Sequence, residues 1–179
     1  MTEITSEQIA AQLSPLKLGE DRELIHWQHR DQQRLAAQFL AEQARRTLSL
    51  LSYDLAPAVY DQPPFLEAVK QLAIRSPLTE IRILLQSNER VQKQGHRLLE
   101  LARRLTSKIE IRRPHADYLN YLENFLVVDA TGYIRQKAYN QSEGEICFNG
   151  KLQATKQQTL FNEIWECSEA DSALRRLYL

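Results

Sequence analysis

The fold is decided by the stretch Phe125-Leu-Val-Val-Asp129, Ala130-Thr131-Gly132, Tyr133-Ile-Arg-Gln-Lys137. Two apolar or alternating runs flank a short turn that contains a glycine, and this arrangement predicts a β-hairpin. An aspartate at the start of such a turn commonly accepts hydrogen bonds from backbone amides. A further strand is predicted over Glu145–Asn149.

Upstream of the hairpin, strand and helix patterns alternate. Buried strands are predicted at Thr47–Tyr53, Glu80–Gln86 and Lys108–Arg113, with helices from Asp31 to Arg46, after Pro64, and from about Asn88 to Leu105. This order is typical of right-handed crossovers and a mostly parallel sheet that helices cover on both faces. A long closing helix is predicted with Leu152, Leu160, Trp165, Leu174 and Leu177 on its buried side.

The chain of 179 residues has the size of one domain. Residues 1–30 are interpreted as a short helical N-terminal extension, with a helix over Ser6–Leu13, and residues 31–179 as one α/β domain. The predicted fold class is therefore α/β, with a mixed, mostly parallel sheet flanked by helices.

Composition excludes several classes of protein. Lys plus Arg and Asp plus Glu both number 23, so bulk charge does not favour a general polyanion binder. The two cysteines form no disulfide framework, and His26 and His29 lack a third ligand, so no metal is expected. Since no phosphate-binding or dinucleotide glycine motif occurs, no cofactor is expected either. The longest apolar runs are too short for a membrane span and no signal-peptide pattern is present, so a cytoplasmic location is expected.

The order of elements, the strand Phe125–Asp129 and the helical stretch Leu160-Phe-Asn-Glu-Ile-Trp165 together resemble one half of a phospholipase D-like phosphodiesterase. The resemblance covers about Leu35 to Leu177. That superfamily carries the motif H-x-K-x-x-x-x-D on the strand that runs into the hairpin, followed by Gly-Ser-x-Asn. The resemblance implies that, in active members, the histidine attacks phosphorus while lysine and asparagine stabilise the phosphate oxygens.

This sequence departs from the motif where the chemistry lies. With the motif aspartate aligned on Asp129, the nucleophile position holds Leu122 and the lysine position holds Asn124. The Gly-Ser-x-Asn position reads Gln136-Lys137-Ala138-Tyr139, with Asn140 just beyond it. No catalytic residue is therefore assigned, and the motif is degenerate.

An anion site is still expected at the strand ends, where open α/β sheets bind ligands. The candidates for binding a phosphate-containing ligand are Asn124, Asp129, Lys137, Asn140, Arg112, Arg113 and His115. Tyr118, Tyr121 and Tyr139 also qualify as a stacking platform, which keeps nucleic acid binding open as a secondary hypothesis.

Three functions follow. The first is a non-catalytic binding or association module, which the resemblance also expects to form a homodimer with Leu122 and Phe125 at the seam. The second is a phosphodiesterase or nuclease with a displaced site, in which His115 replaces the nucleophile. The third is an accessory module of an acetyltransferase-type protein, by resemblance to segments that occur beside such domains.

Overall fold

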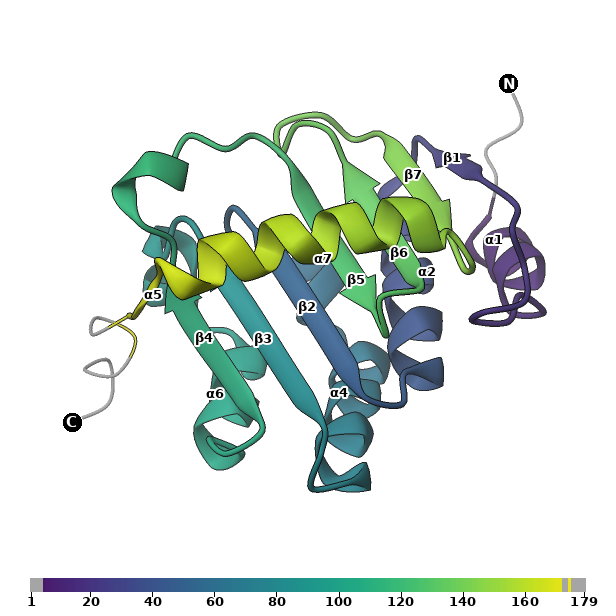
Figure 1. Ribbon diagram of the computed structural model, residues 1–179. Coiled ribbons are helices and arrows are strands. Elements are labelled where there is room, and N and C mark those ends of the chain that lie inside the picture. Colours follow the sequence, from purple (N-terminus) through teal and green to yellow (C-terminus); the bar gives the residue numbers. More distant parts are fainter. Residues whose placement is uncertain (1–4, 172–173, 175–179) are drawn as a thin grey trace.

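The computed structural model describes residues 5–171 and residue 174. Its centre is an eight-stranded mixed sheet in the order β1-β7-β6-β5-β2-β3-β4-β8 (Figure 1). The strands are β1 (Ile25–Trp27), β2 (Thr47–Ser52), β3 (Glu80–Leu85), β4 (Ile109–Arg113), β5 (Asn124–Val128), β6 (Gly132–Gln136), β7 (Gly144–Cys147) and β8 (Glu169–Ala170).

Helices cover the two faces of the sheet unequally. One face carries most of them, and α7 (Lys151–Glu166) crosses the other face as a single diagonal rod (Figure 1). The remaining helices are α1 (Ser6–Leu13), α2 (Arg30–Gln43), α3 (Pro57–Tyr60), α4 (Pro63–Arg75), α5 (Glu89–Gln94), α6 (Arg97–Arg104) and the 3-10 turn η1 (Ala116–Tyr118). The predicted α/β architecture, a mixed sheet flanked by helices, is confirmed.

The parallel part of the sheet is smaller than the alternation of strands and helices predicts. Parallel pairing joins β2 to β3 and β3 to β4, whereas the other five pairings in the described sheet are antiparallel. The reason is the connection over residues 114–123, which contains η1 and no crossover helix. Without such a crossover the chain re-enters the sheet at the edge where β4 ended, so β5 runs antiparallel to β2.

Both faces of the central strands are apolar, as expected for strands covered on two sides. Along β5, Leu126 and Val128 join the larger core beneath α2, α4 and α6, while Phe125 and Val127 join the core beneath α7. Phe161 and Trp165 of α7 stack at 5.6 Å between ring centroids and pack in the same second core. The predicted core role of these two helix residues is confirmed.

The segment before residue 31 folds back onto the domain. β1 forms an edge strand through antiparallel pairing with β7, and Trp27 is completely buried in the main core. Ile9 and Leu13 of α1 are buried in that same core, and the Ser6 hydroxyl donates a hydrogen bond to the Asp31 carboxylate. Treating residues 1–30 as a unit apart from 31–179 stays a prediction, and the described part of that segment contributes to one continuous core.

Two helices differ from their predicted form. The helix predicted from Asn88 to Leu105 is split into α5 and α6, because Gly95 adopts a positive φ of 72° that ends the first of them. The closing helix ends at Glu166, and its buried side is set by Ala154 and Ile164, whereas Leu152 is 76% exposed. The part of that prediction that falls on Leu177 lies outside the described residues.

His96 begins α6 and is buried, with 3% of its surface exposed, although its polar neighbours in the sequence are typical of a solvated helix. Its Nδ1 accepts a hydrogen bond from the Leu98 amide at 3.2 Å, and Nε2 lies 2.9 Å from the Leu55 carbonyl, which requires the neutral form with a proton on Nε2. Burial lowers the pKa of His96, and the charge of Asp61 partly opposes this effect.

This geometry predicts a dependence of stability on pH. The pKa of His96 lies below the ordinary value of about 6.5, so the unfolded chain binds the proton first. The associated stability is complete above about pH 6.5 and is lost as the pH falls through the pKa of the folded state. We expect the His96→Asn variant, which keeps a cap acceptor for Leu98, to flatten this acid limb of the unfolding free energy. His115→Asn, at an exposed histidine, is the control; an unchanged limb in His96→Asn contradicts the assignment.

Candidate functional site

Polar side chains gather where four neighbouring strands meet one edge of the sheet. Ser52 ends β2, Gln86 directly follows β3, Asn124 begins β5 and Gln136 ends β6. All four side chains are buried, and Asn124 is 8% exposed. This is the edge at which the parallel strands β2, β3 and β4 end, the usual place for ligands in open α/β sheets.

Asn124 uses both of its side-chain polar atoms inside the protein. Its Oδ1 accepts a hydrogen bond from the Tyr53 amide at 2.8 Å, and its Nδ2 donates to Oε1 of Gln136 at 3.1 Å. Gln136 in turn donates from Nε2 to the carbonyls of Tyr139 and Gln141. The amide chain therefore ties β5 to β2 and to the loop that follows β6.

Gln86 ties down the second loop above this edge. Its Nε2 donates to the carbonyls of Tyr121, at 2.8 Å, and Tyr118, at 3.3 Å. The Tyr139 ring stacks on the Tyr53 ring with centroids 3.9 Å apart and planes inclined by 6°. Buried amides from below and a pair of aromatic rings therefore hold both loops against the strand ends. Together, Ser52, Gln86, Asn124 and Gln136 are called the amide edge below.

Arg135, the residue before Gln136 in β6, forms an ion pair with Glu123. Nε and an Nη atom of Arg135 lie 3.0 Å and 2.7 Å from the two carboxylate oxygens of Glu123, which is a bidentate pair. These hydrogen bonds raise the pKa of Arg135, so its positive charge is fixed. Burial, followed by the Glu123 charge, raises the pKa of Tyr121 to about 12, so this phenol stays protonated at neutral pH. Neither group acts as a base here.

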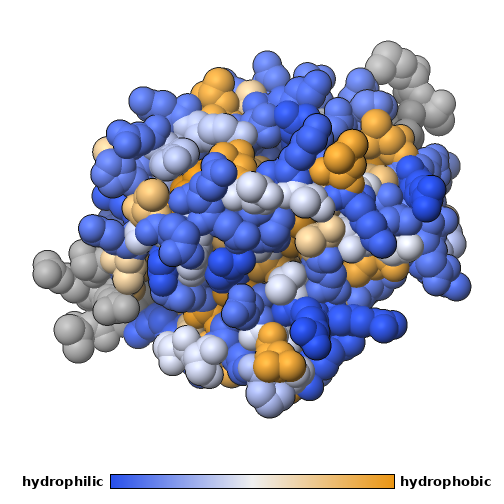
Figure 2. All heavy atoms as spheres, in the orientation of Figure 1, coloured by the Kyte–Doolittle hydropathy of each residue, from blue (hydrophilic) through white to orange (hydrophobic). Residues whose placement is uncertain are grey.

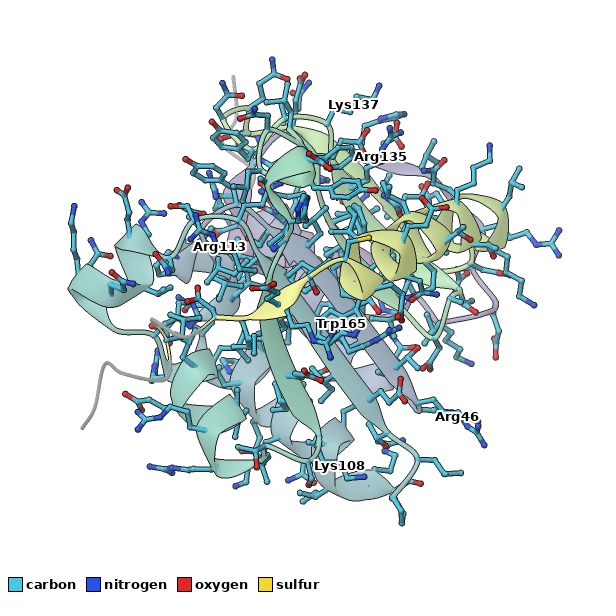
Figure 3. The ribbon with its side chains drawn as sticks, turned by 60° about the vertical axis from the view of Figure 1, so that its left-hand side comes forward. Arg46, Lys108, Arg113, Arg135, Lys137 and Trp165 are labelled. Carbon is cyan, nitrogen blue, oxygen red and sulfur yellow. The ribbon has the colours of Figure 1, made fainter. Side chains whose placement is uncertain are left out.

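Four of the predicted ligand-binding residues surround the amide edge on the outside. Lys137 follows β6 and Arg113 ends β4, and both are exposed (Figure 3). Asn140, further along the loop after β6, and His115, two residues after β4, are exposed as well. His115 accepts a hydrogen bond at Nδ1 from the Asp117 amide at 3.3 Å, and its ring lies 3.2 Å from the Asp117 carboxylate.

Arg112 serves a packing role. Its guanidinium lies over the Trp165 ring, 4.4 Å from the centroid, and Nε donates to Glu110 at 2.8 Å. The side chain is thereby held against the sheet face under the C-terminal end of α7, which satisfies its charge within the fold.

Asp129 lies at the opposite end of β5 from Asn124, about 17 Å away along a strand that rises about 3.4 Å per residue. Its carboxylate accepts three backbone hydrogen bonds, from the amides of Arg45, Arg46 and Thr47 at 2.8–2.9 Å. Its φ of 50° is in the left-handed region that aspartate tolerates in turns. The turn role predicted for this aspartate agrees with these contacts, and Asp129 and Asn124 do not share one ligand site.

The amide edge predicts a clear effect on stability. Asn124→Ala leaves the backbone amide of Tyr53 and the side-chain oxygen Oε1 of Gln136 without a partner. We expect this to cost about 2–3 kcal/mol of unfolding free energy. Asn140→Ala, at an exposed loop position, is the matched control and should change stability by less than about 0.5 kcal/mol. Chemical denaturation measures both, and equal effects would contradict the role given to Asn124.

The three backbone hydrogen bonds to the Asp129 carboxylate, called the turn clamp here, predict a second effect on stability. Asp129→Asn keeps a residue that tolerates a positive φ but removes a charged acceptor of three amides, so we expect a loss of about 1–3 kcal/mol. Glu143→Gln removes an exposed carboxylate in another loop and serves as the control. If thermal and urea unfolding of Asp129→Asn match those of the unaltered protein, the clamp is energetically unimportant.

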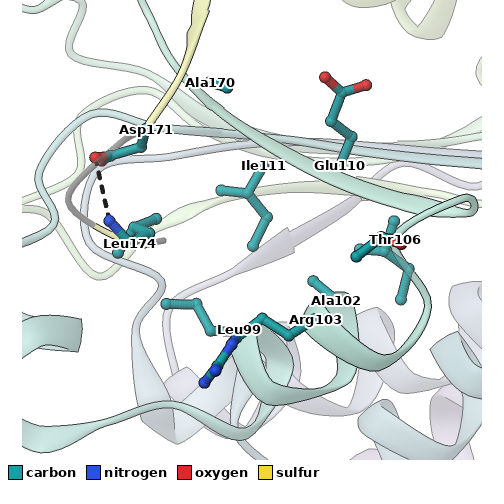
Figure 4. A pocket seen from close by; sticks show the side chains of 10 residues that line it. Leu99, Ala102, Arg103, Thr106, Glu110, Ile111, Ala170, Asp171 and Leu174 are labelled. Carbon is teal, nitrogen blue, oxygen red and sulfur yellow. Dashed lines mark hydrogen bonds between the residues drawn. The ribbon is translucent and has the colours of Figure 1, made fainter. Parts of the chain in front are cut away.

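A separate pocket of about 360 Å³ lies between α6 and the edge formed by β4 and β8 (Figure 4). The lining residues are Leu99, Ala102, Arg103, Thr106, Ile109, Glu110, Ile111, Ala170, Asp171 and Leu174. Most of this lining is apolar, and the Asp171 carboxylate accepts a hydrogen bond from the Leu174 amide. None of the predicted ligand-binding residues lines this pocket.

Within residues 5–171 and 174, no group of three or more His, Cys, Asp or Glu side chains is placed to hold a metal ion. In that same part of the chain, none of the helices has the length and apolar character needed to cross a membrane.

The sequence analysis names Asn124 as a ligand-binding candidate and names neither Gln136, its hydrogen-bond partner, nor Gln86 as part of this site. Gln86 and Gln136 hold the two loops, yet the pattern predicts Gln86 only as a strand end and Gln136 only as a strand residue at the Gly-Ser-x-Asn position. The available signal was a polar residue at the same end of three apolar strands, at Ser52, Gln86 and Gln136. Since β5 runs antiparallel, its contribution to this edge lies at its start, and the pattern becomes visible only once the topology is known.

Solved structures share this fold. TrmBL2, an archaeal chromatin protein described with a novel mode of DNA binding, matches with a TM-score of 0.60 and 16% identity over 92% of this chain and 60% of that one. Nuc from Salmonella typhimurium, a phospholipase D family member, matches with a TM-score of 0.57 and 11% identity over 83% of this chain and 95% of that one. NucT from Helicobacter pylori matches with a TM-score of 0.60 and 12% identity over 83% of this chain and 98% of that one. The fold is therefore phospholipase D-like.

The chain belongs to the family described as domain of unknown function DUF7931, whose model matches residues 29–177. A search of curated proteins found no match. The chain spans 60% of the length of TrmBL2, and at 11–16% identity these structural similarities establish the fold alone.

Proposed function

We propose that this protein is a non-catalytic phospholipase D-like domain that works by binding another molecule. The observation that carries the proposal is the state of Asn124, whose oxygen and nitrogen are both engaged inside the fold. In the proposed register Asn124 occupies the place of the motif lysine. A neutral amide offers no positive charge to a phosphate, and here its oxygen and one N–H of its NH₂ group are already bonded inside the fold.

The other motif positions support the same conclusion. Leu122 occupies the proposed place of the nucleophile, and a leucine side chain has no atom that can attack phosphorus. Tyr139 occupies the place of the motif asparagine, and its ring is stacked on Tyr53. Phosphoryl transfer needs a nucleophile in line and donors aimed at the developing charge. The residues at the amide edge instead hold the two neighbouring loops against the strand ends.

An activity assay tests the proposal. With bis(p-nitrophenyl) phosphate or duplex DNA as substrate, we expect the purified protein to hydrolyse no faster than buffer, with a phospholipase D-type nuclease as the positive control. Hydrolysis above the blank that disappears in His115→Ala would overturn the proposal. That result would establish the second candidate, a phosphodiesterase whose nucleophile is displaced to His115.

The second candidate rests on the position of His115 beside Arg113. Both are exposed at the strand-end edge, and the Asp117 amide holds the imidazole through Nδ1, which leaves Nε2 on the other side of the ring. In that arrangement the neutral ring carries its proton on Nε2, so attack on phosphorus from Nε2 requires the tautomer with the proton on Nδ1, which the Asp117 carboxylate, 3.2 Å away, can accept as a hydrogen bond.

Binding of a phosphate-containing ligand, nucleic acid included, is the third element of the proposal. Exposed Arg113 and Lys137 flank the tyrosines that cover the amide edge, and TrmBL2, which shares the fold, is described as binding DNA. Fluorescence anisotropy with a labelled oligonucleotide should show salt-sensitive binding that Arg113→Glu and Lys137→Glu weaken. Lys70→Glu on α4, paired to Glu67 away from this edge, is the control.

A further inference from the structure

The outer face of α7 carries a regular exposed stripe. Residues at alternating spacings of four and three fall on one side of a helix, and here they are Leu152, Lys156, Thr159, Glu163 and Glu166. All five are exposed, and no other described element covers this side of α7 (Figure 1). The same face in Figure 2 is hydrophilic along most of its length, with apolar spots over the N-terminal end of the helix.

Charges on the stripe, and on Lys151 beside it, oppose the dipole of their own helix. Lys151 and Lys156 lie in the N-terminal half, where the helix dipole favours anions, and Glu163 and Glu166 lie in the C-terminal half, where it favours cations. Among the described residues none of these four side chains has an ion-pair partner. An isolated surface helix would be more stable with the opposite order, so the pattern indicates that something else meets this face.

We infer that α7 is the contact surface for a second copy of this chain, packed antiparallel across a two-fold axis near Thr159. Lys156 and Glu163 are seven residues apart, which is about 10.5 Å along the helix at about 1.5 Å per residue and within about 20° around it. A two-fold axis midway between them sets Lys156 of each copy opposite Glu163 of the partner. Each salt bridge therefore occurs twice.

The shape of α7 fits the same arrangement. A shallow groove of about 480 Å³ runs along its N-terminal half, lined by Lys151, Leu152, Thr155, Lys156 and Thr159. In the antiparallel pair this cationic groove faces the C-terminal half of the partner helix, so the carboxylates of Glu163 and Glu166 enter it. The small threonines near the axis permit close approach, and the antiparallel dipoles attract each other. Leu152, 76% exposed in one chain, becomes covered.

The charges on the outer face of α7 are matched better by a second copy of the chain than by other partners. The positive and negative halves lie on one helix and complement each other only under a two-fold operation. A nucleic acid or an anionic membrane would meet Glu163 and Glu166 with like charge. Of the two residues predicted at a dimer seam, Phe125 is 1% exposed in the core beneath α7 and cannot reach a partner, whereas Leu122 is 55% exposed.

The inference rests on the proposed function, since it names the partner of the binding module, and a charge-swap experiment tests it. Sedimentation equilibrium of the full chain over a concentration series should show a dimer. Lys156→Glu and Glu163→Lys should each weaken it by about tenfold or more, because either change converts two attractive pairs into repulsive ones. The double variant should restore the original affinity, and Lys93→Glu, an exposed lysine on α5, should leave it unchanged.

A cross-link places the axis independently. Thr159→Cys in a Cys167→Ser background should form a disulfide-linked dimer on mild oxidation, whereas Lys93→Cys in that background should not. A monomer at every concentration, or single variants that dimerise as well as the unaltered chain, would overturn the inference. Either result leaves the proposed loss of catalysis standing, because that proposal fails only if phosphodiester hydrolysis is found.

Discussion

The burial of β5 on both of its faces is the constraint on which the rest of this structure depends. Its five residues lie between β2 and β6, with one side in each hydrophobic core. Because β5 is antiparallel to β2, its first residue joins the edge where the parallel strands end and the residue after its last joins the opposite edge. Asn124 and Asp129 therefore hold opposite ends of the same strand, and both act on the start or end of β2.

Under the proposed function, the amide edge explains how a phospholipase D-like fold can persist without phosphoryl transfer. A catalytic edge needs charged groups that are exposed and incompletely hydrogen-bonded, and such groups reduce the stability of the fold. Here this edge holds neutral amides, which bond the Tyr53 amide and the carbonyls of the two loops. On this proposal, neutral amides in place of charged groups avoid the stability cost of a charged cleft.

Much of the fold could be predicted because hydrophobic periodicity encodes it locally. The hairpin over residues 125–137, the strands β2 to β4 and the core positions of Phe161 and Trp165 all follow from short-range pattern. What could not be predicted depends on topology. The direction of β5, the edge strand β1 and the burial of His96 result from contacts between distant segments, such as the bond between His96 and the Leu55 carbonyl. The same holds for the site, where a local motif identified Asn124 but not Gln86, whose partners lie more than thirty residues away.

The inner face of α7 is explained by its packing on the sheet, whereas the order of charges on its outer face is not explained by contacts within one chain. On the inner face, Phe161, Ile164 and Trp165 satisfy the sheet, and Arg82 and Arg112 lie over the aromatic rings. These contacts anchor the helix whatever its exposed residues are, so the charges outside were free to follow the helix dipole. The exposed charges instead oppose the helix dipole, and no ion pair within the described residues of the single chain offsets this loss of stability. In the proposed dimer, the charges at each end of α7 are paired with opposite charges, because each end of the helix meets the opposite end of the helix in the second copy.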